Sequence, residues 1–188
     1  MLARKPPGLR LWRHVLGPLN GDDGAWSIGN GFAAAGLARM IATLGAWEGG
    51  KGMVSAKKDM VGWVKGIVEG VKGVDESSGA ENGLLRNYVD DESWFGEVAG
   101  TALMASAVFR MAVLEPRVFE RYVEWAERKA EAVRRHTNPD TGIAAPAVQE
   151  LNSMVREPIG TGSAEGQSFV MLLYAARRDY IRWQKGEM

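Results

Sequence analysis

The sequence predicts an all-α fold built from α-hairpin repeats, and three observations support this prediction. Apolar residues recur at helical spacing, extended segments are nearly absent, and helices of two kinds alternate along the chain. One kind is apolar on all sides and begins at a glycine followed by a polar residue. The other kind is amphipathic and carries its charges on one face. Buried inner helices that alternate with half-exposed outer helices are typical of a toroid or a solenoid of hairpins.

The first hairpin is predicted from an apolar inner helix over residues 28–46, which ends at Gly49-Gly50. Ser55 is the predicted N-cap of the first outer helix, which continues to about Gly73. Glycine costs roughly 1 kcal/mol per helical position relative to alanine, so a stripe of glycines indicates close packing against a neighbour. Such a stripe runs along this helix at intervals of four: Gly62, Gly66 and Gly70.

A polar loop over residues 75–82 and a short extended segment over 84–89 lead to the second hairpin. The remaining predicted elements are an inner helix over 94–114, a stop at Pro116, an outer helix over 117–136, a loop over 137–162 and an inner helix over 163–184. A loop of that length in a compact domain often lies over a functional site. The methionines on the apolar helix faces are predicted to be core residues: Met104, Met111 and Met171.

The inner helices form an internal repeat. They start at Gly29, Gly100 and Gly166, which are 71 and then 66 residues apart, and an arginine follows each glycine by ten or eleven residues: Arg39, Arg110 and Arg177. The residue after each glycine is polar: Asn30, Thr101 and Gln167. These three side chains either converge on a polyhydroxylated, anionic ligand at one end of the ring or cap their own helices.

The repeat length sets an expectation about the ring. Three inner helices with their outer helices make about two and a half hairpins, and at about 70 residues per hairpin a ring does not close in 188 residues. Open ends would leave apolar inner faces in water. We therefore expect either further hairpins from residues outside this sequence, as in a fragment, or self-association through the open edge of the ring.

Composition excludes several classes of function. The 23 basic and 23 acidic residues balance, which removes the electrostatic reason to expect nucleic acid or an anionic membrane as a partner. There is no cysteine for a disulfide, a thiolate nucleophile or a metal ligand, and His14 and His136 alone cannot form a multi-histidine metal site. No cofactor is expected. No apolar segment approaches the roughly 20 residues of a membrane helix, no signal peptide is apparent, and the compartment stays undetermined.

Three ordered motifs, spread over most of residues 11–176, resemble the unsaturated rhamnogalacturonyl hydrolases, a glycoside hydrolase family with a six-hairpin toroid. That family has a histidine before a Trp-x-Arg-Gly-Asn-(Gly/Ala)-Trp motif, a Glu-x-Ser-Gly-Thr-Ala-Met-Phe segment and a glycine-rich turn into the last inner helix. The corresponding residues here are His14 with Trp26-Ser27-Ile28-Gly29-Asn30-Gly31-Phe32, then Glu97-Val98-Ala99-Gly100-Thr101-Ala102-Leu103-Met104, then Gly160-Thr161-Gly162-Ser163-Ala164-Glu165-Gly166-Gln167.

The resemblance implies an enzyme that acts on oligosaccharides ending in a 4,5-unsaturated uronic acid, derived from pectin or rhamnogalacturonan. In that family an aspartic acid protonates the double bond, water adds to the neighbouring carbon, and the resulting hemiketal collapses to release the next sugar. Carried over to this sequence, His14 contacts the substrate, Trp26 and Phe32 form aromatic walls, and Gly29 and Asn30 shape the adjoining turn.

Two departures from the family pattern limit this interpretation. Ile28 stands where the family has an arginine that can bind the uronate carboxylate. The catalytic aspartate of the family lies upstream of the histidine, outside this sequence, and the nearby Asp22 and Asp23 are interpreted as solvated loop residues.

Three hypotheses therefore stay open at the sequence level. The first is the C-terminal half of an unsaturated uronyl hydrolase whose activity is impaired by truncation. The second is a non-catalytic carbohydrate-binding or scaffold remnant of the same fold. The third is an unrelated helical-repeat protein that binds other proteins.

Overall fold

The computed structural model describes residues 10–149 and 151–187. The sequence also predicts that residues 1–10 are irregular, and this prediction falls almost entirely outside the described residues. The inner helices are α1 (Ser27–Ala46), α3 (Val98–Leu114) and α6 (Ala164–Gln184), and the outer helices are α2 (Val54–Ser78) and α5 (Val123–Arg135). The short elements are η1 (Glu48–Gly52), β1 (Leu85–Arg86), β2 (Gly96–Glu97), α4 (Pro116–Phe119) and η2 (Glu120–Tyr122). The predicted all-α hairpin architecture is confirmed.

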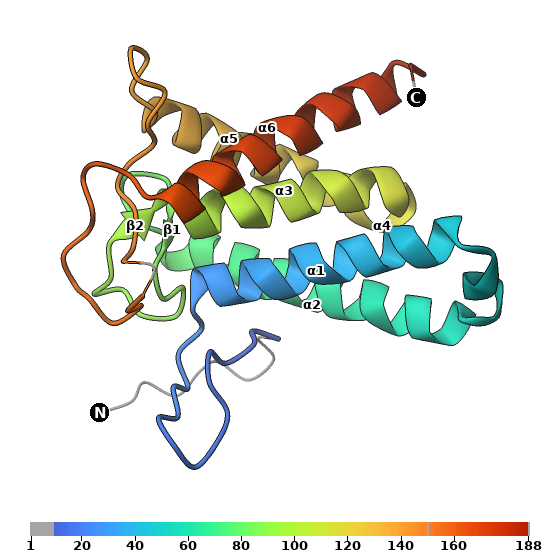
Figure 1. The fold of residues 1–188 in the computed structure, drawn as a ribbon, viewed down its shortest axis with the longest axis horizontal. Helices are drawn as coiled ribbons and strands as arrows, with labels where there is room; N and C mark the ends of the chain where they lie inside the picture. Colours follow the sequence, from blue (N-terminus) through green and yellow to red (C-terminus); the bar gives the residue numbers. More distant parts are fainter. Residues whose placement is uncertain (1–9, 150, 188) are drawn as a thin grey trace.

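Helix α3 is the centre of the molecule. It lies between α1 and α6, and α5 packs on it from behind (Figure 1). Fourteen of its 17 residues are buried, and Phe109 and Met111 are fully buried among them. Small residues let the neighbouring helices approach closely: a Cβ atom added to Gly31 of α1 would lie 3.1 Å from the side chain of Leu103. Burial of each large apolar side chain contributes about 1.5–3 kcal/mol. Helix α3 supplies more buried hydrophobic residues than any other described helix.

All three inner helices begin at the same end of the molecule, where the loops and both strands gather (Figure 1). Short extended segments pair side by side there: Leu85 with Glu97 in an antiparallel ladder, and Trp26 with Tyr88 in an isolated bridge. The predicted helix over 94–114 therefore begins later, at Val98, because residues 96–97 are used in strand pairing.

The polar residue after each repeat glycine holds one of these extended segments in place. Asn30 is buried, Thr101 is buried, and Gln167 is partly buried. Each side chain accepts a backbone N–H from a segment that precedes it in the chain; the donors are, in order, Trp12 at 2.9 Å, Leu85 at 2.8 Å and Ala144 at 3.1 Å. The alternative that these residues cap their own helices is therefore wrong, because the N-caps are Trp26, Glu97 and Ser163. All three side chains instead hold backbone of a preceding segment, and their convergence on a ligand stays a prediction.

The helix N-caps lie three residues before the repeat glycines. Glu97 accepts hydrogen bonds from the backbone N–H groups of Ala99 and Gly100, and Ser163 accepts one from Gly166. These bonds satisfy N–H groups that have no partner inside the helix.

Helix α2 differs from its prediction at both ends. It begins at Val54 and has no side-chain cap, so the prediction that Ser55 is its N-cap is wrong. It continues to Ser78 rather than ending near Gly73, because its last turns are tied to α5. The carboxylate of Asp75 accepts hydrogen bonds from Lys129 at 2.6 Å and from the Trp125 indole at 2.8 Å.

The glycine stripe of α2 does not pack against a helix. A Cβ atom at Gly66 would meet the side chain of Arg10, and one at Gly70 would meet that of Leu11, both within 3 Å. Gly62 has open space around its Cβ position. The segment that leads into the first hairpin therefore lies across α2, and only two of the three glycines serve this contact.

The second outer helix is interrupted. Pro116 occupies the first turn of the short helix α4, and a 3-10 turn separates α4 from α5. The rings of Phe119 and Tyr122 in this stretch are both buried and lie 5.8 Å apart. The single predicted helix over 117–136 is therefore wrong in detail.

Surface ion pairs link neighbouring helices. Arg110 of α3 lies 2.7 Å from Asp179 of α6, and Arg177 of α6 lies 2.7 Å from Glu127 of α5. Pairs this exposed contribute at most about 1 kcal/mol each.

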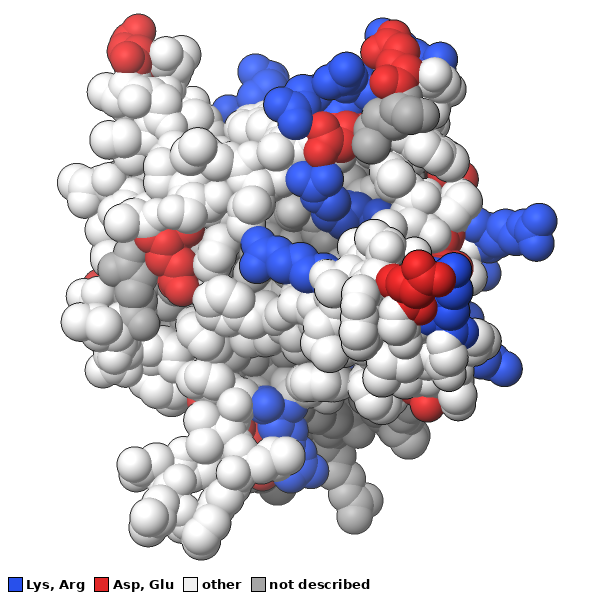
Figure 2. Space-filling view, turned by 45° about the vertical axis from the view of Figure 1, so that its right-hand side comes forward, with Lys and Arg blue, Asp and Glu red and all other residues white. Residues whose placement is uncertain are grey.

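The charges are unevenly distributed over the surface, although the formal net charge is zero. On the face shown in Figure 2, most Lys and Arg side chains gather in the upper half around a hollow.

Glu97 joins α1 to α3 and makes stability depend on pH. It is fully buried, and the Ser27 hydroxyl of α1 donates a hydrogen bond to it at 2.9 Å. Burial raises the pKa of Glu97 from an ordinary 4.5 to about 7, although hydrogen bonds from Gly100, Ser27 and Ala99 oppose this increase. The folded state thus binds a proton that the unfolded state has already released between these two values.

We therefore expect the free energy of unfolding to fall as the pH rises from about 4.5 to about 7, by up to about 3 kcal/mol. Urea denaturation at successive pH values measures this effect. Glu97→Gln, which removes the titrating group, should flatten the dependence, while Glu92→Gln at an exposed position should leave it unchanged. Equal pH dependence in the wild type and Glu97→Gln would contradict the assignment.

The two flanking inner helices expose apolar faces. Phe32 and Met40 of α1 are 47% and 55% exposed, and Met171 of α6 is 70% exposed. The prediction that Met171 is a core residue is wrong because no described helix covers that face of α6, whereas the predicted Met104 and Met111 are fully buried. We propose that the chain self-associates through these faces.

Light scattering of the purified chain should accordingly report a mass above the 20.5 kDa of one copy. The double variant Met40→Glu/Met171→Glu should shift the mass toward a single copy, because buried carboxylates disfavour an apolar interface. Lys58→Glu, at an exposed position of α2, is the control for added negative charge. A wild-type chain that is monomeric at all concentrations tested would refute this proposal.

Candidate functional site

A hydrogen-bonded cluster of His14, Asp22 and Tyr88 lies at the end of the molecule where the inner helices begin. His14 Nδ1 is 2.9 Å from Asp22 Oδ2 and 3.2 Å from the Tyr88 hydroxyl. The Tyr88 hydroxyl donates to the same Asp22 oxygen at 2.5 Å, and the Gly24 N–H donates to the other oxygen at 2.9 Å. The Tyr88 hydroxyl, the Gly24 N–H and the His14 ring thus converge on one carboxylate.

The surroundings fix the charge of this cluster. Partial burial works against ionisation of Asp22, but hydrogen bonds from Tyr88, Gly24 and His14 outweigh it, so the pKa of Asp22 is lowered. The pKa of Tyr88 is raised, first by burial and then by its hydrogen bond to Asp22. At neutral pH the cluster therefore contains an ionised carboxylate and a protonated phenol. The expectation that Asp22 is a solvated loop residue is wrong; it holds for Asp23, whose side chain is 66% exposed beside Arg13.

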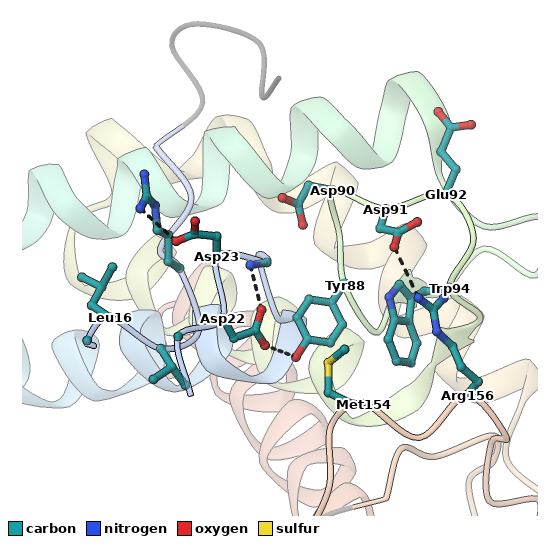
Figure 3. A pocket seen from close by; sticks show the side chains of 15 residues that line it. Leu16, Asp22, Asp23, Tyr88, Asp90, Asp91, Glu92, Trp94, Met154 and Arg156 are labelled. Atoms are coloured by element: carbon teal, nitrogen blue, oxygen red, sulfur yellow. Dashed lines mark hydrogen bonds and ion pairs between the residues drawn. The ribbon is translucent and has the colours of Figure 1, made fainter. Parts of the chain in front are cut away.

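Asp22 and Tyr88 also line an open cleft of about 1150 Å³ (Figure 3). The turn that carries Leu16 forms one wall, and the segment that carries Met154 and Arg156 forms another. The cleft is lined by five acidic residues and two arginines: Asp22, Asp23, Asp90, Asp91, Glu92, Arg13 and Arg156. This excess of carboxylates provides acceptors for hydroxyl groups and repels anions.

Arg156 is already engaged in the cleft. Its guanidinium lies 3.8 Å from the centre of the Trp94 ring and 3.6 Å from the carboxylate of Asp91. Trp94 is buried between this guanidinium and the ring of Tyr88, whose centre is 5.0 Å away. The long predicted loop is thereby attached to the wall of the cleft, which agrees with the expectation that it lies over a site.

Three of the five predicted binding residues come together. The rings of His14 and Trp26 lie 4.5 Å apart, and a Cβ atom at Gly29 would approach the Trp26 ring to 3.2 Å. The glycine thus lets the indole lie over the first turn of α1. The other two predicted residues do not join this group. Asn30 is buried and its side chain accepts the Trp12 N–H. Phe32 is directed toward α6, where its ring meets that of Phe169 edge-on at 5.4 Å.

Ile28 is fully buried in the core. The position at which the resembling family carries an arginine therefore has no access to a ligand in this chain. A carboxylate bound near Trp26 would have to be held by another group.

Sequence reasoning missed Asn87, Tyr88 and Ser153, which complete the cluster from other parts of the chain. Asn87 accepts a hydrogen bond from the Trp26 indole at 2.8 Å and donates one to the Ser153 carbonyl at 2.7 Å. The Tyr88 and Ser153 hydroxyls are 3.0 Å apart. The only signal in the sequence was the extended segment over 84–89, which gave no reason to place it beside His14.

The described residues contain neither a metal site nor a membrane helix. Within residues 10–149 and 151–187, no three His, Cys, Asp or Glu side chains are grouped so that they could hold a metal ion. No helix in that part of the chain is both long and apolar enough to span a bilayer.

Comparison with known proteins identifies the fold but not the family. No protein-family model matches the sequence, and no curated protein matches it. Solved structures do match. A protein described as a possible member of the GH105 family, from Salmonella enterica serovar Paratyphi A, superposes with a TM-score of 0.72 at 18% identity, over 93% of this chain and 46% of that chain.

Two further structures agree. A glycosyl hydrolase family 88 protein from Bacteroides vulgatus gives a TM-score of 0.67 at 15% identity, over 92% of this chain and 50% of its own. The other is an unsaturated glucuronyl hydrolase from a Bacillus species, described as responsible for the degradation of glycosaminoglycan. It gives a TM-score of 0.60 at 16% identity, over 89% of this chain and 41% of its own. This chain has about half of a six-hairpin α/α toroid. The predicted fold class is confirmed, and the chain spans about half the length of the proteins it matches.

The buried amide of Asn30 should be needed to hold the segment that carries His14. Its Oδ1 accepts the Trp12 N–H and its Nδ2 donates to the Trp12 carbonyl, each at 2.9 Å. Asn30→Ala would leave both backbone groups without their partner, which costs about 1–3 kcal/mol. Hydrogen exchange should show faster exchange in residues 12–24, while residues 98–114 stay protected. Thr43→Ala, at an exposed position of the same helix, is the control; unchanged exchange in Asn30→Ala would contradict the role.

Proposed function

We propose that this chain binds the unsaturated uronyl end of pectin-derived oligosaccharides, as half of a glycoside hydrolase ring that works by hydration of the double bond. The observation that carries the proposal is the packing of His14 against Trp26 at the start of the first inner helix. Support comes from the resemblance of residues 11–32 to rhamnogalacturonyl hydrolases and from the fold shared with a glycosyl hydrolase family 88 protein and with an unsaturated glucuronyl hydrolase.

The chemistry of the exposed groups suits a sugar. An indole offers an apolar face to the C–H groups of a pyranose ring, and partly exposed Trp26 is held by its hydrogen bond to Asn87. His14 and the carboxylates of the adjoining cleft supply hydrogen-bonding groups for hydroxyls.

Turnover requires a proton donor for the double bond, and the groups of the site do not suit that role. Asp22 is ionised, and Tyr88 holds its proton in a hydrogen bond to that carboxylate. Glu97 has a pKa of about 7 but is fully buried and caps α3. We therefore expect the 188-residue chain to bind saccharide without converting it.

A second candidate, a non-catalytic carbohydrate-binding protein, is favoured by one observation. Ile28 is fully buried where the resembling family has an arginine for the uronate. A protein without that contact would bind the sugar rings and discriminate weakly between unsaturated and saturated ends.

Calorimetric titration with an unsaturated uronyl disaccharide, its saturated counterpart and a neutral disaccharide tests both candidates. His14→Ala and Trp26→Ala should each weaken binding of the unsaturated ligand about tenfold or more, about 1.4 kcal/mol or above. Trp63→Ala, which removes a 53% exposed tryptophan from α2, should have no effect. Circular dichroism checks that the variants fold.

The outcomes separate the candidates. Preference for the unsaturated ligand supports the hydrolase-type site, and equal affinity for the saturated one supports the second candidate. The ultraviolet absorbance of the unsaturated uronate should stay constant, so a measurable decrease would refute the expectation of no turnover. Failure of the wild type to bind any of the three saccharides would refute both.

A further inference from the structure

The cluster at His14 contains a feature that contact with a sugar alone does not require: both neighbours of Nδ1 are acceptors. Asp22 Oδ2 lies 2.9 Å from Nδ1, and an ionised carboxylate has no proton to donate. The Tyr88 oxygen lies 3.2 Å from Nδ1, and its own proton is directed to Asp22 at 2.5 Å. A hydrogen atom on Nδ1 satisfies both contacts, and its absence would place lone pairs against each other.

This arrangement determines which nitrogen of the neutral imidazole is protonated. With hydrogen on Nδ1, the other ring nitrogen, Nε2, carries a lone pair and can only accept. The Nδ1 edge faces Asp22 and Tyr88, the Trp26 ring lies 4.5 Å away at a tilt of 45°, and the side chain is still 24% exposed. No hydrogen bond from a described residue engages Nε2, so this is the ring nitrogen that stays available to a ligand.

The orientation of the ring is secured from several directions. The His14 N–H donates to the Gly24 carbonyl at 2.9 Å, which closes the turn that carries Asp22. Tyr88 comes from the extended segment between α2 and α3, 66 residues from Asp22, and is itself fixed by Ser153. Residues from three separate segments therefore fix the orientation of one imidazole ring. A histidine that only fills space in the packing does not need so many hydrogen-bonded contacts.

We propose that Asp22 and Tyr88 are positioning residues that hold His14 in the Nδ1–H form, so that Nε2 accepts a hydrogen bond from a hydroxyl group of the bound saccharide. The recognition step rests on the proposed function, whereas the positioning is a property of the free protein. The two can therefore fail separately.

Nitrogen NMR of the full chain labelled with ¹⁵N-histidine reads the protonated nitrogen directly, above the pH at which imidazole titrates. The chain has only two histidines, and His136→Gln assigns the spectrum. His136 provides an internal reference, because its Nδ1 lies 2.8 Å from the Ala132 carbonyl, an acceptor that also requires Nδ1–H. We expect the Nδ1–H form for His14.

Asp22→Ala should abolish this preference and leave a mixture of both forms, with about a tenfold loss of affinity for the unsaturated disaccharide. Tyr88→Phe should keep Nδ1–H as the major form, because Asp22 is retained, but should admit some of the Nε2–H form because the second acceptor is lost. A Tyr88→Phe spectrum identical to that of the wild type would overturn the role of Tyr88. Asp59→Ala, which removes an exposed carboxylate of α2 that does not line the cleft, should change neither the NMR shifts nor the affinity.

The wild-type spectrum decides the inference even if Asp22→Ala does not fold: an Nε2–H form of His14 would overturn it. A folded Asp22→Ala with an unchanged Nδ1–H form would overturn the role of Asp22. The Nδ1–H form together with no saccharide binding by the wild type would support the positioning and refute the proposed function.

Discussion

The structure depends on satisfying backbone N–H groups around the buried start of α3. Helix α3 has apolar neighbours on several sides, so water cannot complete the hydrogen bonds of its first turn or of the strands beside it. Glu97 accepts from the first turn, and Thr101 accepts from Leu85 of β1. Both side chains are fully buried, and the need to place them there fixes how the extended segments meet the inner helices.

The candidate site follows from this requirement. At the other two inner helices, too, a side-chain oxygen accepts a backbone N–H of a preceding segment: Asn30 accepts from Trp12, and Gln167 accepts from Ala144. Because Asn30 fixes Trp12, the turn that carries His14 and Asp22 is placed over the start of α1, next to Trp26. The segment between β1 and β2 brings Tyr88 to the same point. Structural repetition thus produces one end of the molecule at which loops from every hairpin gather.

The electrostatics of that end are those of a hydroxyl-binding surface rather than an anion-binding one. Carboxylates outnumber guanidinium groups in the cleft, and Arg13 and Arg156 are both paired with acidic neighbours. Burial of Ile28 removes the position from which a further cation could act.

A shared site for His14 and Trp26 was implied by the resemblance to a known family, and their ring contact is a result of the tertiary structure. The sequence by itself determined the helical repeat and the alternation of inner and outer helices. These features are local or periodic, and each depends on the apolar pattern or on residues close together in the chain. The interruption of the second outer helix and the exposure of Met171 were decided by tertiary contacts or by their absence. The state of Asp22 was decided in the same way, because its partner Tyr88 is 66 residues away and only the packing of one hairpin on the next brings the phenol to the carboxylate.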